Sequence, residues 1–349
     1  MENCTKVYLV VTEPLDLIGV DAARQLSALP DTAHVVMAFP KREECHVNKT
    51  LAKLRRALDG DSRQDSFFRV VWFDSSNPST KSALSADARK LAESIYKSFK
   101  RLDGIMLNSH GTGNLQKGED PGVPRKGSGL IPMAEKKLFG NVISLDRLLE
   151  SRLIDNGSRV VFAGTEAARG LPKMGFPVPN ELQPSQVVME QYLNGSIYDS
   201  PFRYESAYGY IGAILALYVA ACGKKHPKIF FSTVSPGMTQ ESLKVIHLPH
   251  PTLFDWITMF IFRVILFPVI LKRYKIAHDY SVGASYFVQA LTGTGEWGQK
   301  SEYESGVFVA AFKGTSGPIG DQYHVPNGTI FRDEALQETA YETVRKFLD

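Results

Sequence analysis

The chain has 349 residues, of which 44% are hydrophobic and 22% are charged, and its formal net charge is +3. This composition supports a large hydrophobic core and excludes extended disorder. The basic residues form no stripe interleaved with aromatic residues, so we expect no nucleic-acid partner.

The cysteines and the start of the chain give expectations about the compartment. Cys4, Cys45 and Cys222 are odd in number and far apart, which predicts neither a disulfide framework nor a zinc site. An apolar run begins at Lys6, and this leaves no room for a signal or transit peptide. We therefore expect a reducing compartment and no metal, whereas the organelle stays open.

Short apolar runs alternate with amphipathic stretches along the chain. The runs predict strands at residues 7–11, 34–38, 68–73, 104–107, 159–163, 228–233 and 306–310. The stretches predict helices at residues 20–29, 87–101, 144–153 and 208–222. This order predicts a single α/β domain over residues 1–349, with a Rossmann-type, doubly wound parallel sheet of seven strands. The strands are apolar without alternation, as in sheets that are covered on both faces.

Three segments interrupt this order, and residues 1–110 before them form the expected nucleotide-binding half. We predict a solvated loop over 111–134, an irregular insertion over 166–205 and a hydrophobic lid or interfacial segment over 240–280. Loops of such length are usually functional or mobile.

The first predicted strand is followed by TEPLDLIG, residues 12–19, and then by a predicted helix. This stretch resembles the Thr-Gly-x-x-x-Gly-Ile-Gly motif of the short-chain dehydrogenase/reductase (SDR) family. Thr12, Ile18 and Gly19 match, whereas Glu13 and Leu17 stand at the first two glycine positions. Those glycines let backbone amides approach a diphosphate at a helix N-terminus, and a carboxylate there opposes the phosphate charge by ~1 to 4 kcal/mol. We therefore expect binding of NADPH, or NADH, to be weak or lost.

The resemblance implies further cofactor contacts in the order of the family. Asp74 corresponds to the carboxylate at the adenine edge, although a helix N-cap explains an aspartate there equally well. Asn108 corresponds to the first residue of the family's Asn-Ala-Gly segment. The remaining contacts are Lys41 and Arg42, which favour the 2′-phosphate of NADPH, and Pro236 and Gly237, which turn beneath the nicotinamide.

The catalytic residues implied by the resemblance are altered. Thr165 stands at the serine position, and Tyr208 stands at the tyrosine position. A free phenol titrates near ~10, so the tyrosine needs a neighbouring cation to act near neutral pH. Gly212 replaces the lysine of Tyr-x-x-x-Lys, and Lys137 stands where the family has asparagine. Lys137 is either a relocated cation that serves Tyr208 or a solvated helix residue.

A hydrophobic stretch over 250–275 predicts a membrane surface or a protein partner. A spanning helix is disfavoured because Asp255 and Arg263 lie inside the stretch and Pro268 interrupts it. An interfacial helix, a lid over a greasy substrate and a helix packed on a partner or on the core all remain open. The apolar residues at helical spacing are Leu253, Trp256, Ile257, Phe260, Ile261, Val264 and Phe267.

In layout, the chain is similar to light-dependent protochlorophyllide reductase and to retinol-dehydrogenase-like SDRs. The resemblance rests on the long insertion before Tyr208, the hydrophobic stretch and the closing acidic helix. Two functions follow. The first is an SDR-like protein that has lost standard catalysis and acts as a membrane-associated or complex-bound accessory subunit. The second is an NADPH-dependent oxidoreductase for a lipophilic carbonyl or alkene, of the size of a retinoid, sterol or tetrapyrrole.

Overall fold

A computed structural model gives the fold of most of the chain. The residues it describes are 6–12, 16–40, 68–73, 81–108, 122–125, 128–170, 182–198, 204–237, 239, 257, 260–261, 278–294, 307–311, 319–321 and 328–348.

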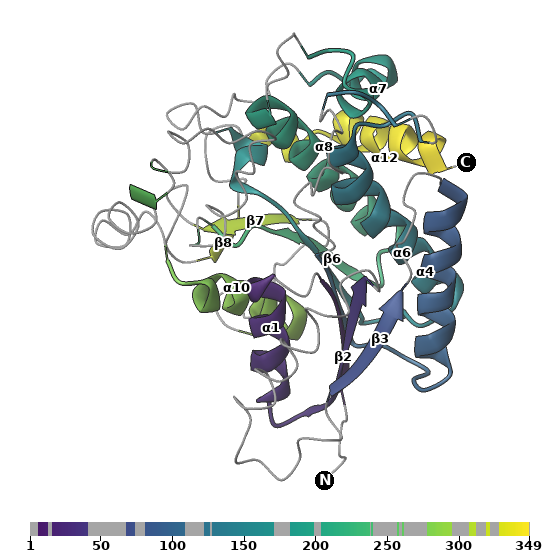
Figure 1. The fold of residues 1–349 in the computed structure, drawn as a ribbon, viewed down its shortest axis with the longest axis vertical. Helices are drawn as coiled ribbons and strands as arrows, with labels where there is room; N and C mark the ends of the chain where they lie inside the picture. Colours follow the sequence, from purple (N-terminus) through teal and green to yellow (C-terminus); the bar gives the residue numbers. More distant parts are fainter. Residues whose placement is uncertain are drawn as a thin grey trace.

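The described residues form one eight-stranded sheet, ordered β3-β2-β1-β4-β5-β6-β7-β8 (Figure 1). The seven predicted strands are confirmed as a parallel set, and β8 adds an antiparallel edge that the sequence did not predict. The order reverses at β1, where the chain passes first to β2 and later to β4, and ligands bind at such a point in doubly wound folds. The strands are β1 (Lys6–Thr12), β2 (Thr32–Pro40), β3 (Phe68–Phe73), β4 (Gly104–Asn108), β5 (Arg159–Ala163), β6 (Phe230–Val234), β7 (Val307–Ala311) and β8 (Ile319–Asp321).

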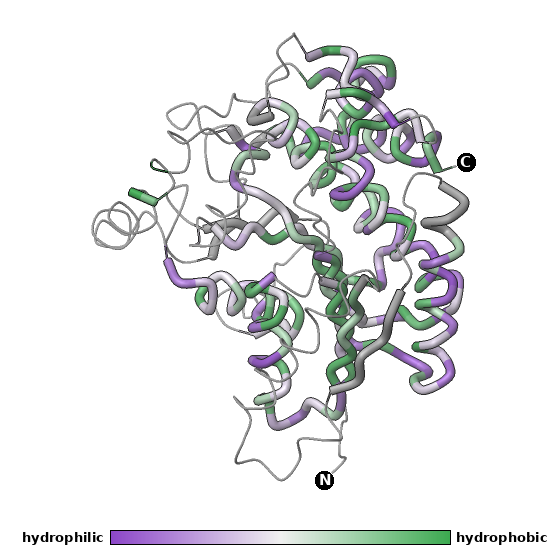
Figure 2. The backbone as a smooth tube through the Cα atoms, viewed as in Figure 1, coloured by the Kyte–Doolittle hydropathy of each residue, from purple (hydrophilic) through white to green (hydrophobic). Residues whose placement is uncertain are grey.

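Helices cover both faces of the sheet. On one face lie α1 (Leu17–Ser27) and α10 (Tyr280–Thr292), which contact each other. The opposite face carries α4 (Lys81–Tyr96), α6 (Gly140–Glu150) and α8 (Tyr204–Lys225). Hydrophobic residues concentrate in the strands, and the outer faces of the helices are more hydrophilic (Figure 2). The predicted two-sided covering is therefore confirmed.

Helix α8 is the longest helix of the described residues and is largely enclosed. Its stretch Ser206–Lys225 is long and apolar enough to cross a membrane, but 89% of its apolar part is buried inside the protein. Its outer side packs against α12 (Glu334–Leu348) and α7 (Gln186–Asn194). A helix that is enclosed by other elements is apolar all round, and α8 is such a core helix.

Parts of two predicted irregular segments are ordered and packed. The helix α7 lies inside the predicted insertion 166–205, which also begins with the short 3-10 helix η3 (Glu166–Arg169). Within the predicted loop 111–134, Leu130 is buried and α5 (Pro132–Ala134) begins a helix, so the end of this segment is not a solvated loop. Proline is favoured in the first turn of a helix, which explains why the helix begins here.

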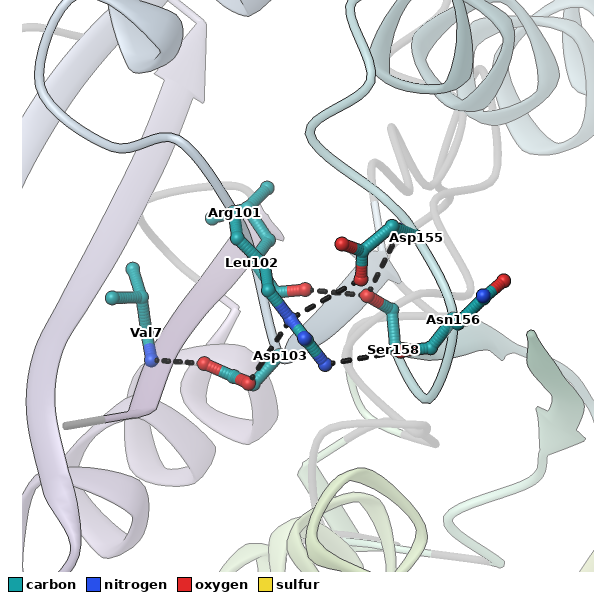
Figure 3. A network of polar contacts seen from close by, with 7 residues as sticks. All are labelled: Val7, Arg101, Leu102, Asp103, Asp155, Asn156 and Ser158. Atoms are coloured by element: carbon teal, nitrogen blue, oxygen red, sulfur yellow. Dashed lines mark hydrogen bonds and ion pairs between the residues drawn. The ribbon is translucent and has the colours of Figure 1, made fainter. Parts of the chain in front are cut away.

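A polar network fixes the starts of three strands (Figure 3). The Val7 amide donates to Asp103 Oδ2 at 2.9 Å, and the Ser158 hydroxyl donates to the Leu102 carbonyl at 2.7 Å. Arg101 lies between Asp103 and Asp155, with Nε to carboxylate distances of 3.6 and 3.2 Å. The network ties together the residues where β1, β4 and β5 begin, so the opposite, carboxyl ends of these strands also meet at one edge.

Candidate active site

Two glycines bring the start of α8 against η3. A Cβ placed on Gly209 would lie 3.0 Å from the Ala167 carbonyl oxygen, and one placed on Gly212 would lie 2.6 Å from Thr165 Cγ2. A larger residue at position 212 would force Thr165 or the helix to shift, and one at position 209 would be in tight contact with the Ala167 carbonyl. The close approach places Tyr208, in the first turns of α8, beside Thr165.

Thr165 is the N-cap of η3 and is 8% exposed. Its hydroxyl oxygen accepts a hydrogen bond from the Ala167 amide at 3.2 Å. The same hydroxyl lies beside the phenol of Tyr208 and helps to lower its pKa. The structure therefore joins the predicted pair of hydroxyl-bearing residues, and the cap holds Thr165 in place.

Lys137 completes the group from a different helix. Its side chain is 3% exposed, and Nζ lies 3.3 Å from the centroid of the Tyr208 ring. The alternative of a solvated helix residue is therefore wrong, because Lys137 is buried with its amino group against the tyrosine ring. A cation over the face of an aromatic ring is attracted by the ring quadrupole, more strongly when water is excluded.

A π-helical turn positions Lys137. The turn η2 (Glu135–Phe139) joins α5 to α6, and such turns are frequent at functional sites. The buried side-chain amide of Asn141 donates to the Lys137 carbonyl oxygen at 2.9 Å. Hydrogen bonding of this carbonyl by a side chain supports the widened turn, which presents Lys137 to α8.

The electrostatics of this group depart from those of free side chains. Burial raises the pKa of Tyr208, but the charge of Lys137, together with hydrogen bonds to Thr165 and Lys137, outweighs it, so the net pKa is lowered. Burial lowers the pKa of Lys137, and the attraction of Tyr208 only partly opposes this. Both shifts make the pair release a proton more readily than the free groups.

At the carboxyl ends of β1 and β4, the side chain of Asp16 joins three elements. It is the N-cap of α1 and accepts from the Ile18 amide at 3.0 Å. The Thr12 hydroxyl donates to its Oδ2 at 2.7 Å, and the Asn108 amide donates to the same oxygen. Thr12 and Asn108 are opposite each other in neighbouring strands. The structure thus gathers three predicted cofactor-binding residues, Thr12, Ile18 and Asn108, around an aspartate that the sequence analysis did not single out.

Gly19 is explained by packing. A Cβ placed there would lie 2.2 Å from Thr12 Oγ1 and 3.1 Å from Asp16 Oδ2. The third glycine of the motif is therefore needed for the close contact of α1 with β1, whether or not a nucleotide binds.

This end of α1 does not fit the diphosphate of a dinucleotide. The Ile18 amide donates to the Asp16 carboxylate. Leu17 adds a side chain at the start of the helix, where the family has glycine. Glu13 lies outside the described residues.

The comparisons with known proteins concern the fold. No protein-family model and no curated protein matches the sequence. Among solved structures, an uncharacterized protein from Mycobacterium paratuberculosis has a TM-score of 0.56 at 11% identity, over 98% of this chain and 93% of that one. L-sorbose reductase from Gluconobacter frateurii, complexed with NADPH and L-sorbose, has a TM-score of 0.53 at 14% identity, over 89% and 96%. A short-chain dehydrogenase from Shigella flexneri complexed with NADP has a TM-score of 0.51 at 13% identity, over 89% and 99%.

The fold is that of the short-chain dehydrogenase/reductases. At these identities the likeness shows the fold alone. The finer resemblance to protochlorophyllide reductase and to retinol-dehydrogenase-like proteins stays a prediction.

The remaining predicted cofactor contacts of the SDR fold are described only in part. Pro236 and Gly237 follow β6, with φ +76° at Gly237 and Gly283 of α10 packed against Pro236. Their predicted place beneath a nicotinamide is not tested. Lys41, Arg42 and Asp74 lie outside the described residues.

Three further residues of the candidate active site and of the start of α1 were not predicted from the sequence. Asp16 occupied an unassigned position of the glycine motif, although an aspartate directly before a helix is a typical N-cap. Asn141 lies four residues after Lys137, and this spacing on a helix was the available signal. Glu135 is buried, accepts from the Ser128 hydroxyl at 3.0 Å and lies 3.4 Å from Arg125 Nη1. Its partners come from the end of the predicted loop, so periodicity could not reveal them.

Only three residues of the apolar stretch 250–275 are described. Ile257, Phe260 and Ile261 are exposed, and Phe260 is the most exposed of them at 64%. Trp256 and Phe267 lie outside the described residues, so the predicted membrane or partner contact is not tested.

Proposed function

We propose that this protein is an SDR-type oxidoreductase for a lipophilic carbonyl or alkene compound. The observation that supports it is the contact of Lys137 with Tyr208, where Nζ is 3.3 Å from the ring centroid. Gly212 removes the lysine that the resemblance predicts, and a buried cation from another helix stands beside the same phenol. Burying a charged lysine costs free energy of folding unless the lysine has a partner. Groups with strongly shifted pKa values concentrate at functional sites.

The described residues account for the proton half of a reduction. Tyr208 Oη donates its proton to the oxygen of a bound carbonyl, and the Thr165 hydroxyl orients that oxygen. Lys137 stabilises the phenolate that remains, because an adjacent positive charge favours the anion. The reverse transfer, from an alcohol to the phenolate, uses the same three groups.

The accessory-subunit function is a second candidate. Asp16 occupies the Ile18 amide at the start of α1, which disfavours standard dinucleotide-dependent catalysis. The exposed side chains of Ile257, Phe260 and Ile261 favour a contact with a membrane surface or a protein partner. Under this candidate, the function depends on the apolar surface and is independent of Tyr208.

The test is a reductase assay on the purified protein with NADPH and with NADH. Retinal, a sterol ketone and a tetrapyrrole with a reducible double bond serve as substrates. We expect activity on at least one of them, and we expect Lys137→Met to abolish it about as fully as Tyr208→Phe does. Lys136→Met is the matched control, since it removes the neighbouring lysine and should retain activity.

Two results would contradict the proposal. Absence of activity with every substrate and both nucleotides would leave the accessory subunit as the better candidate. Activity that needs Tyr208 but tolerates Lys137→Met would show that a water molecule or a substrate group, rather than Lys137, supports the proton transfer.

A further inference from the structure

We propose that Asp16 is a built-in anion that occupies the diphosphate-contacting end of α1, so that a dinucleotide binds well only when this carboxylate is displaced or removed. The inference deepens the proposed function and rests on it, because a dinucleotide is the group expected at this edge of the sheet. Asp16 lies in the same motif as Glu13 and Leu17, which replace the first two glycines, but it is a different residue with its own contacts.

The contacts of Asp16 resemble those that an N-terminal helix site gives to a bound anion. One oxygen accepts from the Ile18 amide at 3.0 Å. The other accepts from the Thr12 hydroxyl at 2.7 Å and from the Asn108 amide. The first amides of a helix and its positive dipole end favour negative charge, and here a side chain of the same chain supplies that charge.

The neighbours of Asp16 are also consistent with a fixed position. Thr12 is fully buried at the end of β1, and Asn108 is 3% exposed at the end of β4. Burial raises the pKa of Asp16, while its hydrogen bonds to Thr12 and to the backbone oppose the shift. The carboxylate therefore has three donors, from β1, α1 and β4, and no cation is needed to explain its place.

Two consequences follow for a dinucleotide. The Ile18 amide is already paired, so a diphosphate must first break that hydrogen bond. The diphosphate also meets a negative charge at contact distance, where the repulsion depends strongly on the local dielectric. Both effects reduce affinity without any change in the acid–base group at Tyr208.

The experiment is a fluorescence titration of the full-length protein with NADPH, using Asp16→Asn and Asp16→Ser. Asparagine keeps the shape and the N-cap but not the charge, whereas serine keeps a cap and also removes bulk. Asp31→Asn is the control, since Asp31 is an exposed carboxylate whose partner, Lys6, lies 2.6 Å away at the start of β1. Circular dichroism and thermal unfolding verify that each variant is folded.

We expect Asp16→Asn and Asp16→Ser to lower the Kd for NADPH at least tenfold and Asp31→Asn to leave it unchanged. Equal affinity in the wild-type protein and in the folded Asp16→Asn variant overturns the inference, as does absence of binding in both. If the serine variant does not fold, the asparagine variant decides alone.

The titration separates this inference from the proposed function. Tighter binding in Asp16→Asn without any reductase activity supports the inference and contradicts the proposed function. Activity that depends on Tyr208 and Lys137 supports the proposed function. If Asp16→Asn then has no effect on the affinity for NADPH, the inference about Asp16 is contradicted while the proposed function stands.

Discussion

The methyl group of Thr165 occupies the space into which a side chain at position 212 would extend. A Cβ on Gly212 would lie 2.6 Å from Thr165 Cγ2 and 3.4 Å from the Ala168 Cβ. Threonine at the serine position and glycine at the lysine position are therefore linked by packing. The lysine that the resemblance predicts has no room here, and Lys137 reaches Tyr208 from another helix.

This packing predicts that the family's lysine cannot be restored by one substitution. Gly212→Lys should lower the free energy of unfolding by ~1–3 kcal/mol, the usual cost of overpacking. Thr165→Ser removes the obstructing methyl group, so the double variant should recover most of that loss. Urea unfolding of both single variants and the double variant measures the coupling. Additive effects would show that Thr165 does not cause the conflict.

The Lys137–Tyr208 pair predicts a pH dependence of stability. Both pKa values are lower in the folded protein than their ordinary values near 10, so the unfolded chain binds more protons in the window between the lowered and the ordinary values. The free energy of unfolding should therefore rise with pH in this window, and the gain should be lost as pH falls through the folded pKa values.

Urea unfolding of the wild-type protein between about pH 7 and pH 10 measures this slope. Lys137→Met should make the slope smaller, because it removes the contribution of the lysine and also the charge that lowers the pKa of Tyr208. Lys136→Met serves as the control. A slope that is unchanged in Lys137→Met would be incompatible with lowered pKa values in this pair.

The glycine replacements predict a gain in nucleotide affinity. Glu13→Gly combined with Leu17→Gly should strengthen NADPH binding, because the changes remove a negative charge and a side chain from the diphosphate approach. Equilibrium titration measures the effect, and Leu29→Gly, beyond the end of α1, is a control for added chain freedom. No gain in a folded double variant would disprove this role of the two residues.

We predict that the apolar stretch 250–275 attaches the protein to a membrane or to a partner protein. Changing Trp256, Phe260 and Phe267 to serine should release the protein from membranes or from a partner, because binding of this kind scales with buried apolar area. Co-sedimentation with membranes measures release. Val187→Ser, at an exposed valine of α7, is the matched control. Sedimentation of the triple variant like the wild-type protein would exclude an interfacial segment.

The π-turn predicts a positioning role for Asn141. Asn141→Ala removes the hydrogen bond to the Lys137 carbonyl and leaves that buried group without this donor, at a cost of about 1–3 kcal/mol. If the turn relaxes, the lowered pKa of Tyr208 should return toward its ordinary value, which a pH profile of the reductase activity would show. A loss of stability with an unchanged profile would indicate a structural role only.

The sequence by itself determined the parallel part of the sheet and the order of its strands along the chain. The apolar runs from residue 7 to residue 310 predicted all seven parallel strands, because a strand buried on both faces must be apolar throughout. Chain order also placed Thr165 before Tyr208 and identified Gly212 as a missing lysine. These features are local in sequence, so pattern and spacing reveal them.

The tertiary structure decided which groups act together. Lys137 and Tyr208 are far apart in sequence, and whether they meet depends on the π-turn before α6 and on the glycines that draw α8 against η3. Asp16 was visible as a residue of the motif, but its bond to Asn108 exists only because β1 and β4 are neighbours in the sheet. Packing and burial set the protonation of these groups, and neither is encoded in the local pattern of the sequence.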